Sequence, residues 1–374
     1  MRKNKSLLTI IMTGACLMGL SLTAWLKSPS EYSDAERRYL EKFPIFNIGS
    51  VVSGEYMKEF ETATTDQFPF REMFRSLKSY FVYDVFKQSD NNDIYMAGDY
   101  VSKLEYPMNE KLLDNASNKF EYLYDTYLKD TNTNIYFSIV PDKNYFMAEE
   151  NGYLSIDYSV LVEYMTSNTE YMQYIDIFEQ LELTDYYLTD THWKQECIID
   201  VARFLGKEMG TFLNSTYEEN VLKKENGEGT HLFEGVYVGQ SASSLKLDEI
   251  HYLTNDVIDD CEVYSYSTGA KKEISMYEFS KAYGKDSYEM FLNGTEAIIE
   301  IVNPKAESEK ELVLFRDSFG SSIAPLLVEG YSKITLIDIR YIDSKLVGNF
   351  VKFDDQDVLF LYSTILLNNS NAFR

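Results

Sequence analysis

The sequence has little of what several common kinds of site require. It contains three histidines and three cysteines in 374 residues, so neither a multi-histidine metal site nor a disulfide scaffold is expected. Cationic residues are also scarce, because 35 Lys and Arg stand against 60 Asp and Glu and leave a formal charge of −25. A chain without clustered cations does not bind the phosphate backbone of nucleic acids, because that binding depends on Lys and Arg side chains. Nucleic-acid binding is therefore excluded, and peripheral docking on anionic lipid is disfavoured.

One long hydrophobic run lies at the N-terminus. It extends over residues 7–26, follows a basic cap at residues 1–5 and is closed by Lys27. Twenty helical residues span about 30 Å, which matches the hydrocarbon core of a bilayer. The positive-inside rule then places the acidic body outside the cytoplasm. Residues 1–27 are predicted as a membrane anchor; a cleaved signal peptide and a lipoprotein signal at Cys16 are the alternatives, and all three export the body.

Two regions and one insertion are predicted beyond the anchor. Residues 28–108 are mixed and aromatic-rich and form an N-terminal extension, whereas residues 109–374 alternate helices with short apolar strands. Such alternation predicts an α/β fold, with a parallel sheet flanked by helices. Residues from about 211 to 305 interrupt it as an irregular insertion of short strands and loops. The strands are expected at 134–140, 171–177, 186–188, 311–315, 333–339 and 357–362, and the main helices at 111–128, 159–167 and after residues 193 and 320.

A serine follows one of these strands. The segment 314–322 (Leu-Phe-Arg-Asp-Ser-Phe-Gly-Ser-Ser) ends an apolar strand, turns, and leads into a helix. Open α/β sheets bind their ligands at the carboxyl ends of the strands, and the free N–H groups of a helix start stabilise an oxyanion. Ser318 is therefore a candidate nucleophile. The alternative is that Asp317, Ser318 or Ser321 only caps the helix.

An acid and a base lie together in a second segment. Asp190 and His192 are two residues apart, so in extended backbone their side chains point to the same side. Imidazole suits the activation of a serine hydroxyl, and a carboxylate fixes its tautomer. The alternative is that Asp190 caps the next helix and His192 lies on the surface. His231 and His251 lie in the irregular insertion and are predicted to be structural or exposed.

These residues resemble the DHHW proteins of Gram-positive bacteria, which are relatives of the AlgX and AlgJ alginate O-acetylation proteins. The resemblance rests on segment 187–193 (Tyr-Leu-Thr-Asp-Thr-His-Trp) followed by 316–320 (Arg-Asp-Ser-Phe-Gly). One position departs from the family pattern, because Thr191 stands at the second position of the Asp-His-His-Trp tetrad. Further matches extend the resemblance over nearly the whole exported body, at 66–71, 141–143, 286–288, 291–294 and 338–341.

The resemblance implies an SGNH-hydrolase-like fold in permuted order. It implies Ser318 as nucleophile, His192 as base and Asp190 as the group that orients the base. Arg340 and Tyr341 are expected to line the pocket by analogy alone. The N–H groups at the start of the helix after Ser318, that of Gly320 among them, are expected to hold the oxyanion. No metal and no cofactor are predicted.

The function that these expectations favour is an extracytoplasmic O-acetyltransferase acting on a cell-surface or secreted polysaccharide through an acyl-serine intermediate. Because acetyl-coenzyme A is cytoplasmic, the resemblance implies a membrane-bound acyltransferase partner as acyl donor. Two alternatives stay open: a carbohydrate acetyl esterase that uses the same three residues, and a non-catalytic carbohydrate-binding scaffold. In an exported body Cys197 and Cys261 are free to pair, and the sequence does not decide whether they do.

Overall fold

The computed structural model describes residues 2–284 and 286–374, and the chain divides into two compact units. The first contains Met1–Asn92 with Val238–Ser244, and the second contains Asp93–Tyr237 with Leu245–Arg374. The first division between these compact units lies between Asn92 and Asp93. The domain boundary predicted at residue 108 stays a prediction. Cys16, Cys197 and Cys261 are unpaired in this structure.

The first unit is mainly helical and begins with the long helix α1 (Arg2–Leu26). Within it, Lys5–Ala24 is long and apolar enough to cross a membrane and is not buried by the rest of the chain. An anchor and a signal sequence share these properties. The other elements of this unit are β1 (Tyr32–Ser33), β2 (Arg38–Tyr39), α2 (Ile48–Ser53), α3 (Glu55–Asp66), α4 (Arg71–Tyr80), a π-helical turn (Phe81–Val85) and β3 (Asp90–Asn91).

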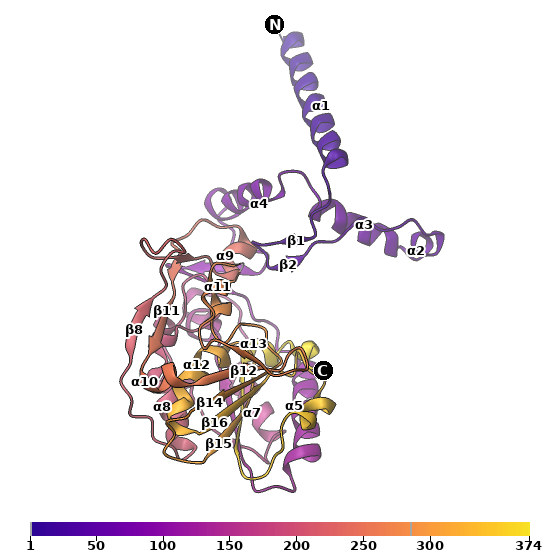
Figure 1. The fold of residues 1–374 in the computed structure, drawn as a ribbon. Helices are drawn as coiled ribbons and strands as arrows, with labels where there is room; N and C mark the ends of the chain where they lie inside the picture. The colour runs from indigo at the N-terminus through magenta and orange to yellow at the C-terminus, as the bar shows by residue number, and fades with distance from the viewer. Residues whose placement is uncertain (1, 285) are drawn as a thin grey trace. The chain divides into compact units, whose positions relative to one another are not determined.

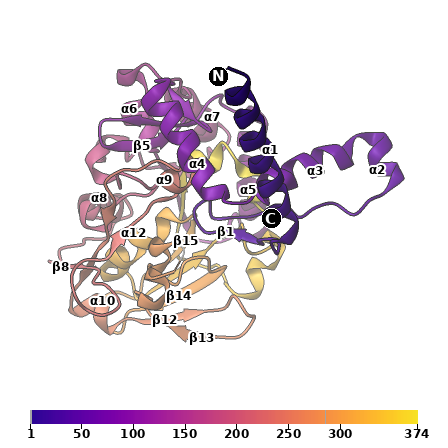
Figure 2. The ribbon, with the colours of Figure 1, turned by 90° about the horizontal axis from the view of Figure 1, so that it is seen from above.

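The second unit is built on an eight-stranded sheet with the order β13-β12-β14-β16-β15-β17-β6-β7. The strands from β16 to β7 are parallel, whereas β14, β12 and β13 continue the sheet in antiparallel pairs. Figure 2 shows β12 and β13 beside β14 at that end of the sheet. The strands are β6 (Asn134–Val140), β7 (Gln173–Tyr174), β12 (Glu262–Ser265), β13 (Lys272–Ile274), β14 (Ile298–Val302), β15 (Glu311–Arg316), β16 (Lys333–Ile337) and β17 (Asp357–Ser363).

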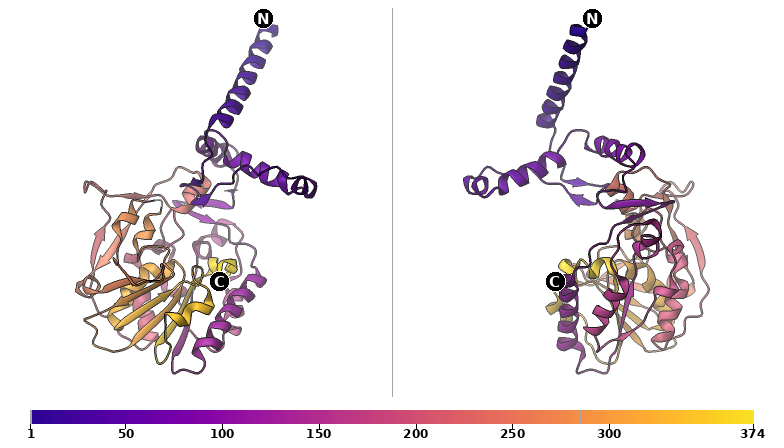
Figure 3. Two further views of the ribbon diagram at one scale, coloured as in Figure 1. Left: turned by 45° about the vertical axis from the view of Figure 1, so that its right-hand side comes forward. Right: turned by 180° about the vertical axis from the view of Figure 1, so that it is seen from behind.

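Helices cover both faces of this sheet (Figures 1 and 3). Successive side chains of a strand point to opposite faces, so Leu312 and Leu314 of β15 pack with α8 (Ile199–Glu208) and α12 (Phe319–Leu327). Val313 and Phe315 pack on the other face with α5 (Glu110–Leu123) and α7 (Tyr158–Ser167). Two hydrophobic cores therefore hold the sheet rigid from both sides.

Short elements complete the second unit. The helices are α6 (Lys143–Met147), α10 (Asp256–Asp260), α11 (Phe279–Ala282) and α13 (Thr364–Leu367), and α9 (Val236–Ser241) begins in this unit. The short strands are β4 (Ile94–Ala97) with β5 (Tyr100–Lys103), β8 (Glu218–Val221) with β11 (His251–Thr254), and β9 (Leu232–Phe233) with β10 (Asp248–Glu249).

The predicted α/β class is confirmed, as a mostly parallel sheet flanked by helices. Two strand predictions need correction. The strand expected at 171–177 is reduced to the two residues of β7. No strand forms at 186–188, where Tyr186 makes only an isolated bridge to Trp193. The irregular region at 211–305 also supplies β12, β13 and β14 to the central sheet. β14 places apolar residues in both cores, whereas Val263 of β12 and Ile274 of β13 pack on one of them.

Candidate active site

Ser318 lies in a turn between β15 and α12, which we call the serine turn (residues 316–320). Ser318 has helical backbone angles and its side chain caps nothing. Asp317 ties the turn together instead: its Oδ1 accepts from the N–H of Phe319 at 3.0 Å, and its Oδ2 accepts from the N–H of Ser363 at 2.8 Å. Because Ser363 ends the neighbouring strand β17, the turn is fixed to the carboxyl edge of the sheet.

Asp190 and His192 lie in an irregular loop, which we call the histidine loop (residues 187–193). It leads into a short 3₁₀ helix before α8, and neither helix uses Asp190 as its cap. Asp190 is fully buried and His192 is 6% exposed, so the alternative of a helix cap and a surface histidine is wrong. The expected strand-to-helix turn is wrong too, because the loop is not an extension of a sheet strand.

The structure brings Asp190, His192 and Ser318 into one hydrogen-bonded chain. The Nδ1 atom of His192 lies 2.6 Å from Oδ1 of Asp190, and its Nε2 atom lies 2.7 Å from Oγ of Ser318. The same carboxylate accepts from the backbone N–H of His192 at 3.2 Å and from that of Val236 at 2.9 Å. A carboxylate held in this way favours the tautomer with the proton on Nδ1, which leaves the Nε2 lone pair for the serine hydroxyl.

Side chains from distant segments hold the histidine loop. Asp248 accepts from the N–H groups of Leu188 and Thr189 at 2.7 and 2.8 Å, and from the Thr189 hydroxyl at 2.5 Å. The buried amine of Lys143 donates to the carbonyl groups of residues 187 and 188 at 3.0 and 3.1 Å. Burial lowers the pKa of Lys143 to about 7. A Cβ at Gly235 would lie 2.2 Å from the Thr189 carbonyl carbon, so only glycine allows this approach.

An aromatic ring supports the imidazole from one face. The ring of Tyr288 is parallel to that of His192, with an interplanar angle of 5° and centroids 3.8 Å apart. The Tyr288 hydroxyl donates to Oγ of Ser322 at 2.7 Å, and the indole N–H of Trp193 donates to the same oxygen at 2.8 Å. Tyr288 is therefore a positioning residue for the imidazole, and burial raises the pKa of its phenol.

The remaining predicted site residues are Arg340, Tyr341 and Gly320. They lie around the buried charges of Asp338 and Arg316. Arg340 forms a bidentate pair with Asp338, and its guanidinium lies over the Tyr341 ring at 5.4 Å. Arg316 is buried 3.6 Å from the same carboxylate. A Cβ at Gly320 would lie 2.6 Å from Cβ of Arg316, and the Gly320 N–H already donates to the carbonyl of residue 317 at 3.1 Å. The side chain of Arg316 leaves no room for a Cβ at residue 320, which explains the glycine there. The substrate or oxyanion roles of Arg340, Tyr341 and Gly320 stay predictions.

The other two histidines lie elsewhere. His231 is near Ser287 at 3.2 Å, and partly exposed His251 pairs with Glu219 at 2.5 Å. Of the residues that hold the histidine loop, Lys143 and Tyr288 lie within recognisable sequence motifs, whereas no motif marks Asp248 or Gly235. Their contacts join segments far apart in the chain, so no local pattern reveals them.

The fold is similar to that of two solved structures. A DHHW family protein from Eubacterium siraeum matches with a TM-score of 0.56 at 18% identity, over 75% of this chain and 92% of that one. Bacillus cereus PatB1, solved with a sulfonyl adduct, matches with a TM-score of 0.55 at 17% identity, over 73% of this chain and 97% of that one. Both likenesses show the fold, as the sequence resemblance predicts.

The O-acetyltransferase domain of Pseudomonas putida AlgJ is less similar. It matches with a TM-score of 0.42 at 11% identity, over 74% of this chain and 92% of that one. No model of a known protein family matches the sequence, and a search of curated proteins finds no match.

Proposed function

We propose that the chain is an extracytoplasmic O-acetyltransferase that acts on a cell-surface or secreted polysaccharide through an acyl-serine intermediate. The observation that carries this proposal is the unbroken chain from Asp190 through His192 to Ser318, with contacts of 2.6 and 2.7 Å. A serine, an imidazole and a carboxylate in this order are the parts of nucleophilic acyl transfer. The sequence resemblance to the DHHW proteins supports acetyl as the acyl group and a polysaccharide as the acceptor.

In the first half-reaction, Oγ of Ser318 attacks the carbonyl carbon of an acetyl ester while its proton passes to Nε2 of His192. The tetrahedral intermediate collapses, the bond to the leaving alcohol breaks, and that alcohol takes the proton from Nε2. Asp190 accepts the Nδ1 proton in a hydrogen bond and stabilises the imidazolium that forms between these steps. The Ser318 N–H, at the start of α12, is the donor that this proposal assigns to the oxyanion.

In the second half-reaction, a sugar hydroxyl attacks the acetyl-serine. Its proton passes to Nε2 of His192, the bond between the acetyl carbon and Oγ breaks, and Oγ of Ser318 takes the proton back. The product is an O-acetylated sugar, and the enzyme returns to its starting state. Water attacking in place of the sugar gives acetate, so acceptor binding decides between transfer and hydrolysis. Arg340 and Tyr341 are proposed to line the acceptor side of the site.

The apolar helix α1 supports a position at the outer surface of the membrane. Acetyl-coenzyme A is cytoplasmic, so an exported enzyme needs an acyl donor that crosses or spans the membrane. We propose a membrane-bound acyltransferase as that donor. The N-terminal segment, as an anchor, would keep the chain at the same membrane, whereas a cleaved chain would have to receive its acyl group by diffusion.

Product analysis tests this function. The full chain in detergent is incubated with an activated acetyl ester and an oligosaccharide, and the sugar products are examined by mass spectrometry. We expect acetylated oligosaccharide from the wild type and from Ser321→Ala, a neighbouring control, and none above background from Ser318→Ala. Release of acetate without acetylated sugar would indicate an esterase, and the absence of both reactions would favour a scaffold.

A further inference from the structure

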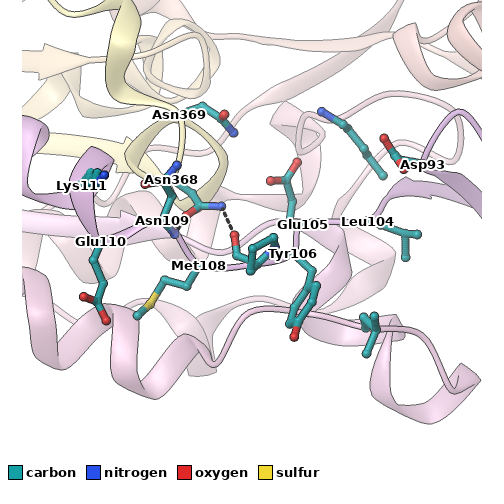
Figure 4. Close-up of a pocket in the computed structure, with 13 residues that line it drawn as sticks. Asp93, Leu104, Glu105, Tyr106, Met108, Asn109, Glu110, Lys111, Asn368 and Asn369 are labelled. Carbon is teal, nitrogen blue, oxygen red and sulfur yellow. Dashed lines mark hydrogen bonds between the residues drawn. The ribbon is translucent and has the colours of Figure 1, made fainter.

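A cavity lies in the same unit as the candidate site, and none of the residues of that site lines it. It has a volume of about 900 Å³ and is lined by the segment 103–111 together with Asp93, Leu154, Asn368 and Asn369. Figure 4 shows these side chains around the cavity. We call it the rim pocket.

Glu105 is the unusual side chain of the rim pocket. It is only 4% exposed, and its Oε1 atom has no hydrogen-bond partner among the described residues. Figure 4 shows its carboxyl group directed toward the space between Asn369 and Asp93. Burial, and the nearby carboxylate of Asp142, raise the pKa of Glu105 to about 7. A buried carboxyl group with an unpaired oxygen is costly to maintain. A small rotation of this side chain toward the cavity would let a ligand hydroxyl satisfy that oxygen.

The rim pocket lies at the edge of the sheet that carries Ser318. Asn368 and Asn369 follow α13, which begins directly after β17. The N–H of Ser363, the last residue of β17, donates to Asp317 in the serine turn at 2.8 Å. α13 has four residues, which rise about 6 Å in a helix. Simultaneous binding at both places requires one extended polymer that follows this edge and contacts both the rim pocket and the serine turn.

The walls of the rim pocket favour a polyhydroxylated ligand with little charge. The side chain of Asn368 donates to the carbonyl of Pro107 at 3.3 Å and accepts from the N–H of Asn109 at 2.7 Å, which fixes that wall. Asn369 adds an amide, and Tyr106 presents an aromatic ring that is 56% exposed. Amide and carboxyl groups hydrogen-bond to hydroxyls, and an exposed ring packs against the apolar face of a sugar. Three acidic and two basic residues line the cavity, so an anionic ligand is disfavoured.

We propose that the rim pocket binds an uncharged sugar residue of the acceptor polysaccharide, with Glu105 and Asn369 bonded to its hydroxyls and Tyr106 packed against its ring. This inference rests on the proposed function for the identity of the polymer. The binding itself does not require Ser318. The pocket therefore determines which glycan is held while the serine reacts with a neighbouring unit.

Direct binding tests the inference separately from the chemistry. Cellohexaose, chitohexaose and hexamannuronate are titrated into full-length Ser318→Ala in detergent, and binding is followed by saturation-transfer NMR and calorimetry. We expect at least one of the two uncharged hexamers to bind more tightly than the uronate. Tyr106→Ala and Glu105→Leu in this background should each raise its Kd about fivefold or more, the equivalent of one lost contact. Phe212→Ala, which truncates an aromatic residue that is 76% exposed elsewhere in this unit, should leave Kd unchanged.

The outcomes are distinguishable. Saturable binding that Tyr106→Ala weakens supports the inference even when acyl transfer is absent. Failure of both uncharged hexamers to bind overturns it, as does an equal Kd in Tyr106→Ala, even when the wild type acetylates sugars. Thermal unfolding shows whether the Glu105→Leu variant has folded. If it has not, Tyr106→Ala alone decides the outcome, because the exposed ring of Tyr106 is not needed for folding.

Discussion

The serine turn and the histidine loop meet at one hydrogen bond, but they are held in different ways. The serine turn continues a strand whose last residue, Arg316, pairs with Leu361 of β17. The histidine loop has no strand behind it, and it depends on Asp248, Lys143 and other side chains that arrive from distant segments. The position of the nucleophile therefore comes from the sheet, through strand β15 and the bond between Ser363 and the serine turn, whereas the position of the base comes from side chains of distant segments. Substitutions should therefore disturb the two regions unequally.

The largest effect is expected where the two regions meet. Ser318→Ala should lower turnover of an acetyl ester by about 10⁴–10⁶-fold, as for other serine nucleophiles. Its midpoint of thermal unfolding should stay close to that of the wild type, because within the part of the chain that the structure describes the Ser318 side chain bonds to no group but His192. Ser321→Ala, three residues further along α12, serves as the control and should keep its activity. Wild-type turnover in Ser318→Ala would place the chemistry elsewhere.

The next effect concerns the acid of the histidine loop. Asp190→Asn should lower turnover by about 10⁴-fold, because an amide no longer favours the tautomer that accepts the serine proton. The folded structure should persist, since the amide oxygen is still able to accept from the N–H of Val236, now 2.9 Å from the carboxylate. Steady-state kinetics with an acetyl ester, together with circular dichroism, measure both effects. A loss of less than tenfold would count against the role of Asp190.

Two glycine substitutions compare the regions directly. A Cβ at residue 235 would meet the backbone of Thr189 at 2.2 Å, whereas a Cβ at residue 320 would meet the side chain of Arg316 at 2.6 Å. Gly235→Ala should therefore move the histidine loop and cost about 10²-fold in turnover, the usual result of a displacement near 1 Å. Gly320→Ala should cost less turnover, because its overlap is with the side chain of Arg316 and the bond from Ser363 keeps the serine turn in place. Equal losses in the two variants would contradict the difference proposed here.

A smaller effect is expected from the ring beneath the imidazole. Tyr288→Leu removes the parallel ring that lies 3.8 Å from His192, and it should lower turnover about tenfold, given the worth of aromatic contacts. Tyr288→Phe keeps the ring and loses only the bond to Ser322, so its loss should stay within about threefold. Kinetics of both variants at several pH values provide the measurement. A larger loss in the Phe variant than in the Leu variant would show that the hydroxyl matters more than the ring.

The smallest effect is a change in the pH dependence of stability. Burial lowers the pKa of Lys143 to about 7 from an ordinary value of 10.5. Between these values the unfolded chain binds more protons, so this group makes the free energy of unfolding rise with pH in that window. Lys143→Met should remove that contribution and flatten the slope in urea titrations between pH 7 and 10. An unchanged slope would show that the amine stays charged when buried.

Much of the fold follows from local patterns. Continuous apolar runs predict β6, β15 and β17 to within a residue of their ends, because buried parallel strands need side chains of that kind on both faces. The prediction fails at 186–188, since the apolar tyrosines there pack into a core without forming a ladder. The apolar pattern indicates that these residues are buried, but it does not indicate whether they pair with a neighbouring strand.

The candidate site divides in the same way. Ser318, Asp190 and His192 are recognisable because short motifs carry them. Asp248 and Gly235 are not recognisable, because each matters through a contact with Thr189, from which they are 59 and 46 residues away in the chain. These contacts are hydrogen bonds of 2.8 and 3.0 Å. Spacing within one segment contains no information about such a contact, and only the folded structure supplies it.

Covalent labelling is the most direct measure of whether the hydroxyl of Ser318 is an activated nucleophile. Sulfonyl fluorides react with activated serine hydroxyls. The full chain is treated with a small sulfonyl fluoride, and the labelled peptide is identified by mass spectrometry. We expect one sulfonyl group on Ser318 of the wild type, none in Ser318→Ala, and much slower labelling in His192→Gln. A label on another residue, or labelling of Ser318 at the same rate without His192, would contradict it.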